Sequence, residues 1–462
     1  MKRLVRLGRS LPVFASGRTL GDSPSREGRS VPRLPLTIFL LLIFLSPALL
    51  RAEEAPRKIV LTDGVRLILK PETVTDSVAI TLFVRVPFDI SANEDATGEL
   101  VSRAFLYGNE NSSFESIAET ISEVGGGLET FRTADTVAVR IVTNGSRIAD
   151  AAYLLAQALK NANFSNDALA RAVRDALGSS QKTHPAETLA NALETLRATF
   201  RPFPMPDRFM LRRVTPEAAQ TYFRERYTPD RTVISLVGNF NPKQAASIFD
   251  DNFFDFRRAS QRPIMQTQSA VSTAFHAPPL RIDTVNPVGI ALVAIAPPSL
   301  DSADYPVFLT INALLGAGHA SRLFQNIRDA QGIGYDVNAA YRPPAPELWA
   351  AYLQWDAGKN TLSPAAALKL LNDEISAVIT RPPTDAELTR ARALAISSLA
   401  LRSERDRDES FLLAWHESLG VGYNFDSRLP RRIEAVTRQD VLRVAREFFS
   451  QRAALLAVPP KP

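Results

Sequence analysis

Two segments of this chain, 222 positions apart, carry nearly the same pattern of residues. Residues 214–227 (VTPEAAQTYFRERY) align with residues 436–449 (VTRQDVLRVAREFF), and both begin with Val-Thr and continue with helical apolar spacing. Earlier in each half, residues 121–126 align with residues 327–332 at an offset of 206. The two matches predict an internal duplication, which restricts the fold to two units of one plan, each of about 205 residues.

The two halves also share an order of expected elements. The first half opens with a strand pair at residues 59–69, which an Asp-Gly turn joins, and it ends in a strand at residues 232–238. The second half runs from a strand at residues 288–296 to a strand at residues 453–458. Between these limits, helices alternate with paired strands in both halves. The order predicts an α+β fold with two α/β-layered domains.

The chain therefore divides into three expected parts. Residues 1–52 form a leader, residues 53–262 an N-terminal domain and residues 263–462 a C-terminal domain, with the join in the polar stretch 257–273. The composition fits folded domains, since 45% of the residues are hydrophobic and 22% are charged. The chain has no cysteine, which excludes a disulfide framework, a thiol nucleophile and a cysteine-ligated zinc site.

The leader has the layout of a secretory signal peptide. Residues 34–50 form an uncharged apolar run, Arg29 and Arg33 precede it, and Ala52 follows at an expected cleavage site. The segment before the run is long and basic, so we expect the true start downstream, near Val31. The alternative is an uncleaved membrane anchor, although the run is shorter than the roughly 20 residues of a spanning helix. We predict export to the periplasm or cell envelope, with membrane association if the segment is retained.

The leader also accounts for the basic character of the chain. It holds nine Lys/Arg and two Asp/Glu, a net charge of +7, whereas the whole chain carries +5. The remaining residues therefore carry a net charge of −2, and we predict no binding to nucleic acid.

Residues 321–337 combine a helix, a glycine turn and the start of a strand. Gly332 is the expected left-handed cap of the helix, and Arg328 and Tyr335 lie seven positions apart on either side of the turn. A guanidinium and a phenol on two rigid elements could both point at one carbonyl group. The alternative interpretation is purely structural, with Arg328 at the helix end and Tyr335 as a half-buried strand residue.

With residues 314–321 before it, this segment resembles the C-terminal domain signature of the insulinase, pitrilysin and mitochondrial processing peptidase family. Further matches to that family follow in order along the chain, at residues 59–69, 113–128 and 227–238. The resemblance implies two homologous domains in a clam-shaped arrangement. It also implies that Arg328 and Tyr335 bind substrate and stabilise the transition state.

Active members of that family carry the zinc motif H-x-x-E-H on the first helix of the N-terminal domain, where two imidazoles bind the metal beside a catalytic glutamate. This chain departs from the motif in either alignment. Anchored on Gly98, the three motif positions fall on Val101, Ala104 and Phe105. Anchored on Gly108, they fall on Glu99, Ser102 and Arg103. Where a third ligand would be expected, at residues 171–178, the one acid is Asp175.

The histidines of the chain supply no substitute for this motif. The four histidines are His184, His276, His319 and His416. No two of them lie three or four positions apart, which is the spacing that two zinc ligands on one face of a helix need. We therefore expect no metal and no cofactor in this chain.

These observations predict a non-catalytic subunit of an envelope metallopeptidase. A homologous partner subunit, in a heterodimer, would carry the zinc, and Arg328 and Tyr335 would act in trans on a peptide substrate. One alternative is a structural or peptide-binding envelope protein that kept the fold and lost the chemistry. Another is an autonomous peptidase with a rearranged metal site, which the few histidines argue against.

Overall fold

The computed structural model describes residues 55–73, 75–86, 91–107, 114–123, 127–133, 135–178, 185–198, 207–256, 278–284, 287–341, 348–359 and 362–459. These residues belong to one compact unit that spans residues 53–462. The expected leader and the expected join at residues 257–273 lie outside the described residues. Within the described part of the chain, no helix is long and apolar enough to cross a membrane.

The first sheet is a mixed sheet with the spatial order β1-β2-β6-β3-β5-β4. Its strands are β1 (Arg57–Val60), β2 (Arg66–Pro71), β3 (Ser77–Arg85), β4 (Leu128–Arg132), β5 (Thr136–Asn144) and β6 (Thr232–Gly238). Strands β2 and β6 are parallel, and the other pairs are antiparallel. The central strand β3 is buried along Val78–Val84, so this sheet is covered on both faces.

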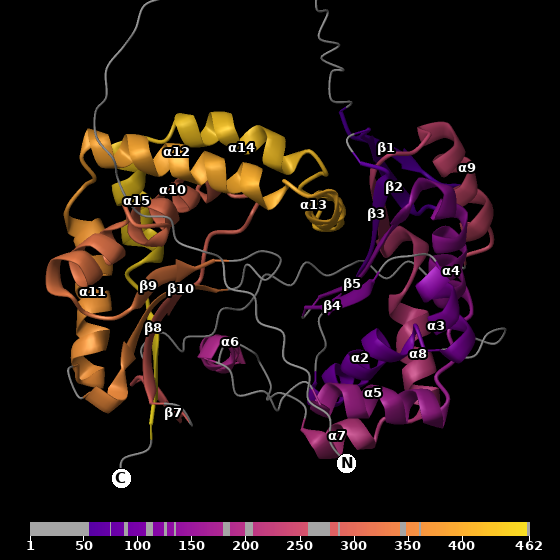
Figure 1. The fold of residues 1–462 in the computed structure, drawn as a ribbon, viewed down its shortest axis with the longest axis horizontal. Helices are drawn as coiled ribbons and strands as arrows, with labels where there is room; N and C mark the ends of the chain where they lie inside the picture. The colour runs from indigo at the N-terminus through magenta and orange to yellow at the C-terminus, as the bar shows by residue number, and fades with distance from the viewer. Residues whose placement is uncertain are drawn as a thin grey trace, which may run out of the picture. The chain divides into compact units, whose positions relative to one another are not determined.

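Helices of the first half cover one face of this sheet (Figure 1). They are α2 (Ala92–Ala104), α3 (Phe114–Glu123), α4 (Ile148–Lys160), α5 (Asn166–Gly178), α7 (Arg208–Arg212), α8 (Pro216–Arg226) and α9 (Pro242–Phe253). Alternate residues of β3, including Ile80, Leu82 and Val84, join the apolar core beneath them. Short 3-10 turns lie at Gly145–Arg147 and Pro229–Arg231.

The second sheet has the order β7-β11-β8-β10-β9. Its strands are β7 (Leu280–Asp283), β8 (Val288–Ile295), β9 (Asp336–Ala340), β10 (Trp349–Asp356) and β11 (Ala453–Val458). Without β1, the first sheet has the same order and the same strand directions, because β2 and β6 correspond to the parallel pair β7 and β11. The two sheets therefore share one topology.

Helices of the second half pack on one face of the second sheet, where Trp349, Leu353 and Val293 enter the core. They are α10 (Tyr305–Gly316), the π-helix η4 (Phe324–Asp329), α11 (Pro364–Thr380), α12 (Asp385–Arg402), α14 (Phe425–Glu434) and α15 (Arg438–Phe448), and the 3-10 turn η5 spans Ala357–Lys359. Thr384 and Thr437 begin α12 and α15 with capping boxes, which satisfy the first free amides of these helices.

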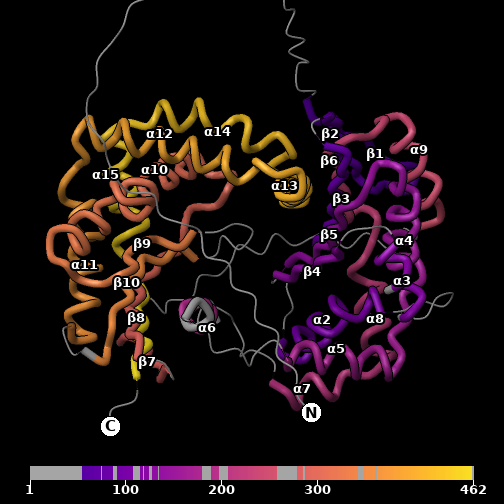
Figure 2. The backbone as a smooth tube through the Cα atoms, viewed as in Figure 1, coloured from indigo at the N-terminus to yellow at the C-terminus, as the bar shows by residue number. Residues whose placement is uncertain are grey.

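Each half also contributes one helix to the sheet of the other half. Helix α13 (Asp406–Ser418) packs on β3 and β6 of the first sheet, and α6 (Pro185–Ala198) packs on β8 and β11 of the second (Figures 1 and 2). The Phe411 ring lies 4.8 Å from the Phe83 ring and 5.4 Å from the Phe131 ring, centre to centre. In the opposite sense, Ala192 and Leu196 of α6 share an apolar cluster with residues of the second sheet.

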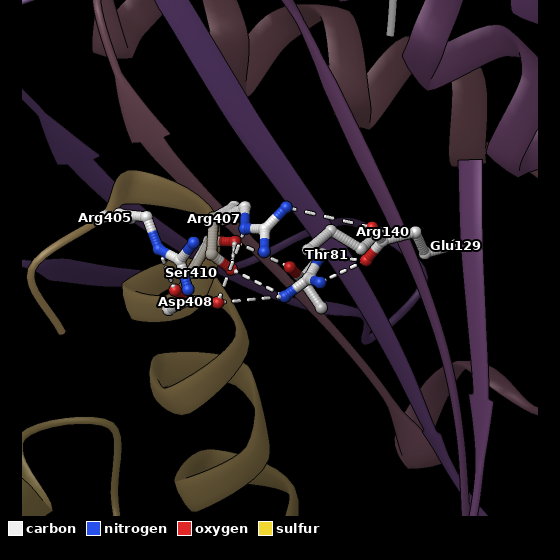
Figure 3. Close-up of polar contacts among 7 residues, drawn as sticks. All are labelled: Thr81, Glu129, Arg140, Arg405, Arg407, Asp408 and Ser410. Atoms are coloured by element: carbon white, nitrogen blue, oxygen red, sulfur yellow. Dashed lines mark hydrogen bonds and ion pairs between the residues drawn. The ribbon is translucent and has the colours of Figure 1, made fainter. Parts of the chain in front are cut away.

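Polar contacts fix α13 on the first sheet (Figure 3). The hydroxyl groups of Thr81 and Ser410 are 2.6 Å apart in a buried position. Arg140 of β5 donates to the carbonyl oxygen of Arg407 at 3.3 Å and pairs with the carboxylate of Asp408 at 3.4 Å. Because buried polar groups without hydrogen-bond partners destabilise a fold, these contacts favour one position and orientation of α13 on the sheet.

The structure confirms the expected strand pair at the start of the first half and corrects the helix limits. Strands β1 and β2 pair antiparallel around Gly64, which has a φ of +96°. The sequence predicts a short helix over residues 99–107. Helix α2 begins earlier, at Ala92, because Ser91 caps it by accepting from the Glu94 amide. The sequence also predicts a helix over residues 321–330, and a helix lies at residues 322–331, although its middle, Phe324–Asp329, is a π-helix.

Candidate functional site

Arg328 and Tyr335 lie together at the edge of the second sheet. Arg328 projects from the π-helix η4, and Tyr335 immediately precedes β9, which is an edge strand. The Arg328 guanidinium donates a hydrogen bond to the backbone carbonyl of Tyr335 and lies 5.1 Å from the centre of the Phe324 ring. Both residues are exposed, and 52% of the Tyr335 surface is accessible. The sequence-predicted pair is thus brought into contact on an open surface.

The Tyr335 side chain is held from the strand behind it. Its hydroxyl donates to the side-chain oxygen of Gln354 at 2.9 Å, and its backbone amide donates to the Gln354 carbonyl at 3.1 Å. The Gln354 amide nitrogen lies 3.4 Å from the Asp336 carboxylate, to which the Tyr352 hydroxyl also donates at 3.2 Å. The sequence reasoning missed Gln354 and Asp336, because cross-strand pairing of residues 18 positions apart is not visible in a local motif.

The turn that aligns the pair depends on two glycines. Gly332 has a φ of +66°, as predicted for a left-handed helix cap, and Gly334 has a φ of +75°. A side-chain carbon at Gly332 would meet nothing within 4 Å. At Gly334 it would lie 2.4 Å from Cδ1 of Leu353 and 3.0 Å from the carbonyl oxygen of Gln354. Gly334 therefore satisfies a conformational and a steric requirement at once.

Replacement of Gly334 by alanine should destabilise the protein more than replacement of Gly332 by alanine. In both variants the free energy of unfolding should fall by about 1–2 kcal/mol, because alanine has a side chain that disfavours the left-handed backbone conformation. Gly334→Ala adds the clash with Leu353, which is typically worth about 1–3 kcal/mol. Urea denaturation of the two variants measures the difference, and equal midpoints would show that Leu353 moves aside without cost.

The family resemblance places the zinc motif on helix α2. Glu99 is bound on both oxygens, by Arg103 at 2.7 Å and by Arg132 at 3.2 Å, and Arg132 also pairs with Asp95 at 2.9 Å. Burial alone would raise the pKa of Glu99, but the two guanidinium groups outweigh it and lower the pKa. The carboxylate is thus charged and engaged by cations.

The residues at the motif positions do not fit a zinc ion. In the alignment on Gly108 they supply one carboxylate, the hydroxyl of Ser102 and the cation Arg103, whereas zinc takes imidazole, thiolate or carboxylate ligands. In the alignment on Gly98 they are three apolar residues of the core: Val101, Ala104 and Phe105. Among the residues that the structure describes, no group of three or more His, Cys, Asp or Glu side chains is arranged to hold a metal.

Asp175 on α5 is also engaged. It accepts a hydrogen bond from the Tyr107 hydroxyl, which follows α2. Burial, with the nearby Asp175 carboxylate, raises the pKa of Tyr107 to about 12. The acid expected near a third ligand position therefore joins α5 to the segment after α2.

Two of the four histidines, His184 and His276, lie outside the described residues. His319 is exposed, and its ring lies 4.5 Å from the Phe324 ring, beside the Arg328 element. His416 on α13 is 1% exposed and lines a pocket of about 400 Å³ between α12, α13 and α14. Its Nε2 lies 3.7 Å from the carboxylate of Asp426.

His416 should make the stability of the protein depend on pH. Burial is the main cause that lowers the pKa of His416 to about 4. The negative Asp426 raises this pKa in part, and the positive Arg402 and Arg428 lower it further. Protonation of His416 is thus harder in the folded chain than in the unfolded chain. Above about pH 6.5 the histidine is neutral in both states and does not reduce the free energy of unfolding. As the pH falls toward 4, the unfolded chain takes up the proton first, and the free energy of unfolding decreases by about 3 kcal/mol.

The measurement is the free energy of unfolding of the wild type and of His416→Gln between pH 7 and pH 4. Because glutamine does not titrate in this range, the difference between the two proteins should change with pH by about 3 kcal/mol. Parallel profiles would mean that His416 is protonated as easily in the folded chain as in the unfolded one.

Comparisons with known proteins relate most of the chain to peptidases. Residues 213–394 match the family model described as the peptidase M16 inactive domain. An uncharacterized zinc protease of Mycobacterium tuberculosis is 23% identical over 426 residues, which cover 88% of this chain and 94% of the relative. The probable mitochondrial-processing peptidase subunit beta of Arabidopsis thaliana is 22% identical over 427 residues, which cover 87% of this chain and 77% of the relative.

Solved structures agree on the fold. A protease from Helicobacter pylori is 13% identical and has a TM-score of 0.76, with 88% of this chain and 99% of that chain covered. A peptidase M16 inactive domain from Pseudomonas fluorescens is 18% identical and has a TM-score of 0.73, with 88% and 98% covered. The predicted α+β class and the family resemblance are confirmed. The chain is thus similar to peptidases of this kind over most of its length, and its residues 213–394 match the model of the peptidase M16 inactive domain.

Proposed function

We propose that this chain is the non-catalytic subunit of an envelope zinc metallopeptidase, and that it supplies Arg328 and Tyr335 to the active site of a zinc-bearing partner. Arg328 would hydrogen-bond the peptide substrate or the developing oxyanion, and Tyr335 would donate to the same centre. Preorganised donors of this kind are each typically worth about 3–4 kcal/mol of transition-state stabilisation.

One observation carries this proposal. The first half has a salt-bridged network on α2 where a metal site would be needed, whereas the second half presents Arg328 and Tyr335 side by side and exposed. The guanidinium uses one of its five N–H groups on the Tyr335 carbonyl, which leaves others for a ligand. A chain of this kind needs the metal of another subunit for peptide cleavage.

Two further parts of the proposal rest on the sequence. The apolar run 34–50, with basic residues before it, supports export to the periplasm or envelope. The common topology of the two sheets supports an internal duplication, in which the second half kept Arg328 and Tyr335. The partner would be a homologue of the same build, so that the assembly is a heterodimer.

The partner tests the proposal directly. The tagged full chain is purified from its own host under native conditions, and the co-purifying proteins are identified by mass spectrometry. We expect a nearly equimolar chain of similar size that carries H-x-x-E-H. A preparation that contains only this chain, or only other envelope proteins, would contradict the proposed subunit role.

The alternative is a structural or peptide-binding envelope protein, and one observation favours it. The Tyr335 hydroxyl and the Arg328 guanidinium both have intramolecular partners, as ordinary stabilising residues would. In that case replacement of either residue would change stability and leave peptide cleavage by any partner unchanged.

A further inference from the structure

We propose that Gln354 is a positioning residue for Tyr335, and that Asp336 and Tyr352 fix the orientation of the Gln354 side chain. The proposal deepens the role suggested above for Tyr335 and rests on it. The observation behind it is a continuous chain of hydrogen-bonded side chains, Tyr352–Asp336–Gln354–Tyr335. It begins at the buried side chain of Tyr352 and ends at the exposed phenol of Tyr335.

The first step concerns the amide of Gln354. A carboxylate accepts hydrogen bonds and cannot donate one, so the atom of Gln354 that faces Asp336 has to be the amide nitrogen. The amide oxygen then faces Tyr335, and the phenol donates to it. Asp336 in turn receives the Tyr352 hydroxyl at 3.2 Å on the same oxygen, Oδ2, and at 3.3 Å on Oδ1. Tyr352 thus orients the Asp336 carboxylate, and Asp336 in turn fixes which way the Gln354 amide faces.

The second step concerns rigidity. Gln354 is 4% exposed and lies within β10, between β8 and β9, so its side chain has little room to move. Tyr335 is 52% exposed and would otherwise be free to change rotamer at the edge of the sheet. Its backbone is already fixed by the Gln354 carbonyl on one side and by Arg328 on the other. The remaining freedom is that of the ring, and the bond to Gln354 removes it.

The third step concerns function. With the ring held, the phenol can pass its hydrogen bond from Gln354 to a substrate oxygen by rotation about the C–O bond alone. The entropic cost of ordering the side chain is then met in folding and not in the reaction. Gln354 itself is buried and acts through Tyr335.

A measurement without the partner tests the geometry. The chain has nine tyrosines, so a spectrum of protein labelled with carbon-13 in the tyrosine rings can be assigned, and Tyr335→Phe identifies the Tyr335 signal. Gln354→Met keeps the length of the side chain and removes both polar atoms. It should move the Tyr335 signal to the position of a freely rotating tyrosine. Gln325→Met, at an exposed position of η4, is the control and should leave the signal in place. An unmoved signal in Gln354→Met would overturn the proposal.

A second measurement uses peptide turnover by the reconstituted pair. Gln354→Met should lower kcat by about twofold to tenfold, the worth of one net hydrogen bond, with KM unchanged. The double variant with Tyr335→Phe should be no slower than Tyr335→Phe alone, because Gln354 acts through the phenol. Independent, multiplying losses would overturn the positioning role. If Tyr335→Phe itself has full activity, the proposed function fails, and the spectrum still decides whether Gln354 orders the ring.

Discussion

Replacement of Phe411 by alanine is expected to destabilise the protein by about 3–5 kcal/mol, the usual loss when a large aromatic side chain is removed from a core. Phe411 is 9% exposed and packs edge-on against Phe83 and Phe131 of the first sheet. The Arg140 guanidinium lies 6.0 Å from its ring centre and 4.9 Å from that of Phe131. The substitution therefore removes ring contacts and leaves a void under α13.

Chemical denaturation of the full chain measures this effect, and Phe254→Ala is the matched control. Phe254 is 56% exposed at the end of α9, so its truncation should change the free energy of unfolding by less than about 0.5 kcal/mol. If Phe411→Ala were as mild as the control, α13 would contribute little to the stability of the first sheet. A loss confined to one of two unfolding steps would show that the halves unfold separately.

Arg328→Ala and Tyr335→Phe are expected to lower peptide turnover by the reconstituted pair about 10- to 1,000-fold, the range for loss of one preorganised donor. Both changes lie at exposed positions and remove at most one or two hydrogen bonds, so the fold should be kept and the complex should still form. The loss should appear in kcat if the two groups act in the transition state, and in KM if they only hold the substrate.

Arg390→Ala controls for loss of an exposed arginine elsewhere on the second half, on α12, and should leave turnover unchanged. Gel filtration of the variants with the partner shows whether the complex forms. Full turnover in both Arg328→Ala and Tyr335→Phe, with the complex intact, would remove these residues from the reaction.

Local sequence was sufficient where one physical effect dominates. The Asp-Gly turn before β2 and the left-handed cap at Gly332 both follow from the freedom of glycine at positive φ. The spacing of Arg328 and Tyr335 also led correctly to two adjacent elements joined by a tight turn. The partners of Tyr335 could not be found in the same way, because Gln354 reaches it across a strand pair.

Other elements were missed because local signals compete with tertiary packing. Helix α14 contains Pro430, which disfavours a helix interior, yet Phe425, Leu429 and Ile433 form a buried stripe that holds the helix in place. The helix expected before Gly332 is present, but its middle at Phe324–Asp329 has π-type hydrogen bonding, for which the spacing of apolar residues gives no distinct pattern. Helix α13 belongs to the second half of the chain but packs on the first sheet, and no local sequence pattern predicts this placement.

The position of α13 has a consequence for synthesis of the chain. The first sheet is complete in sequence once β6 ends at Gly238, but the helix that covers its second face begins only at Asp406, 168 residues later. At about 5–20 residues per second, a ribosome needs roughly 8–34 s to supply it. If the first half folded alone, Phe83, Val233 and their neighbours would lie on an uncovered apolar surface. This surface would then be a binding site for chaperones until α13 is supplied.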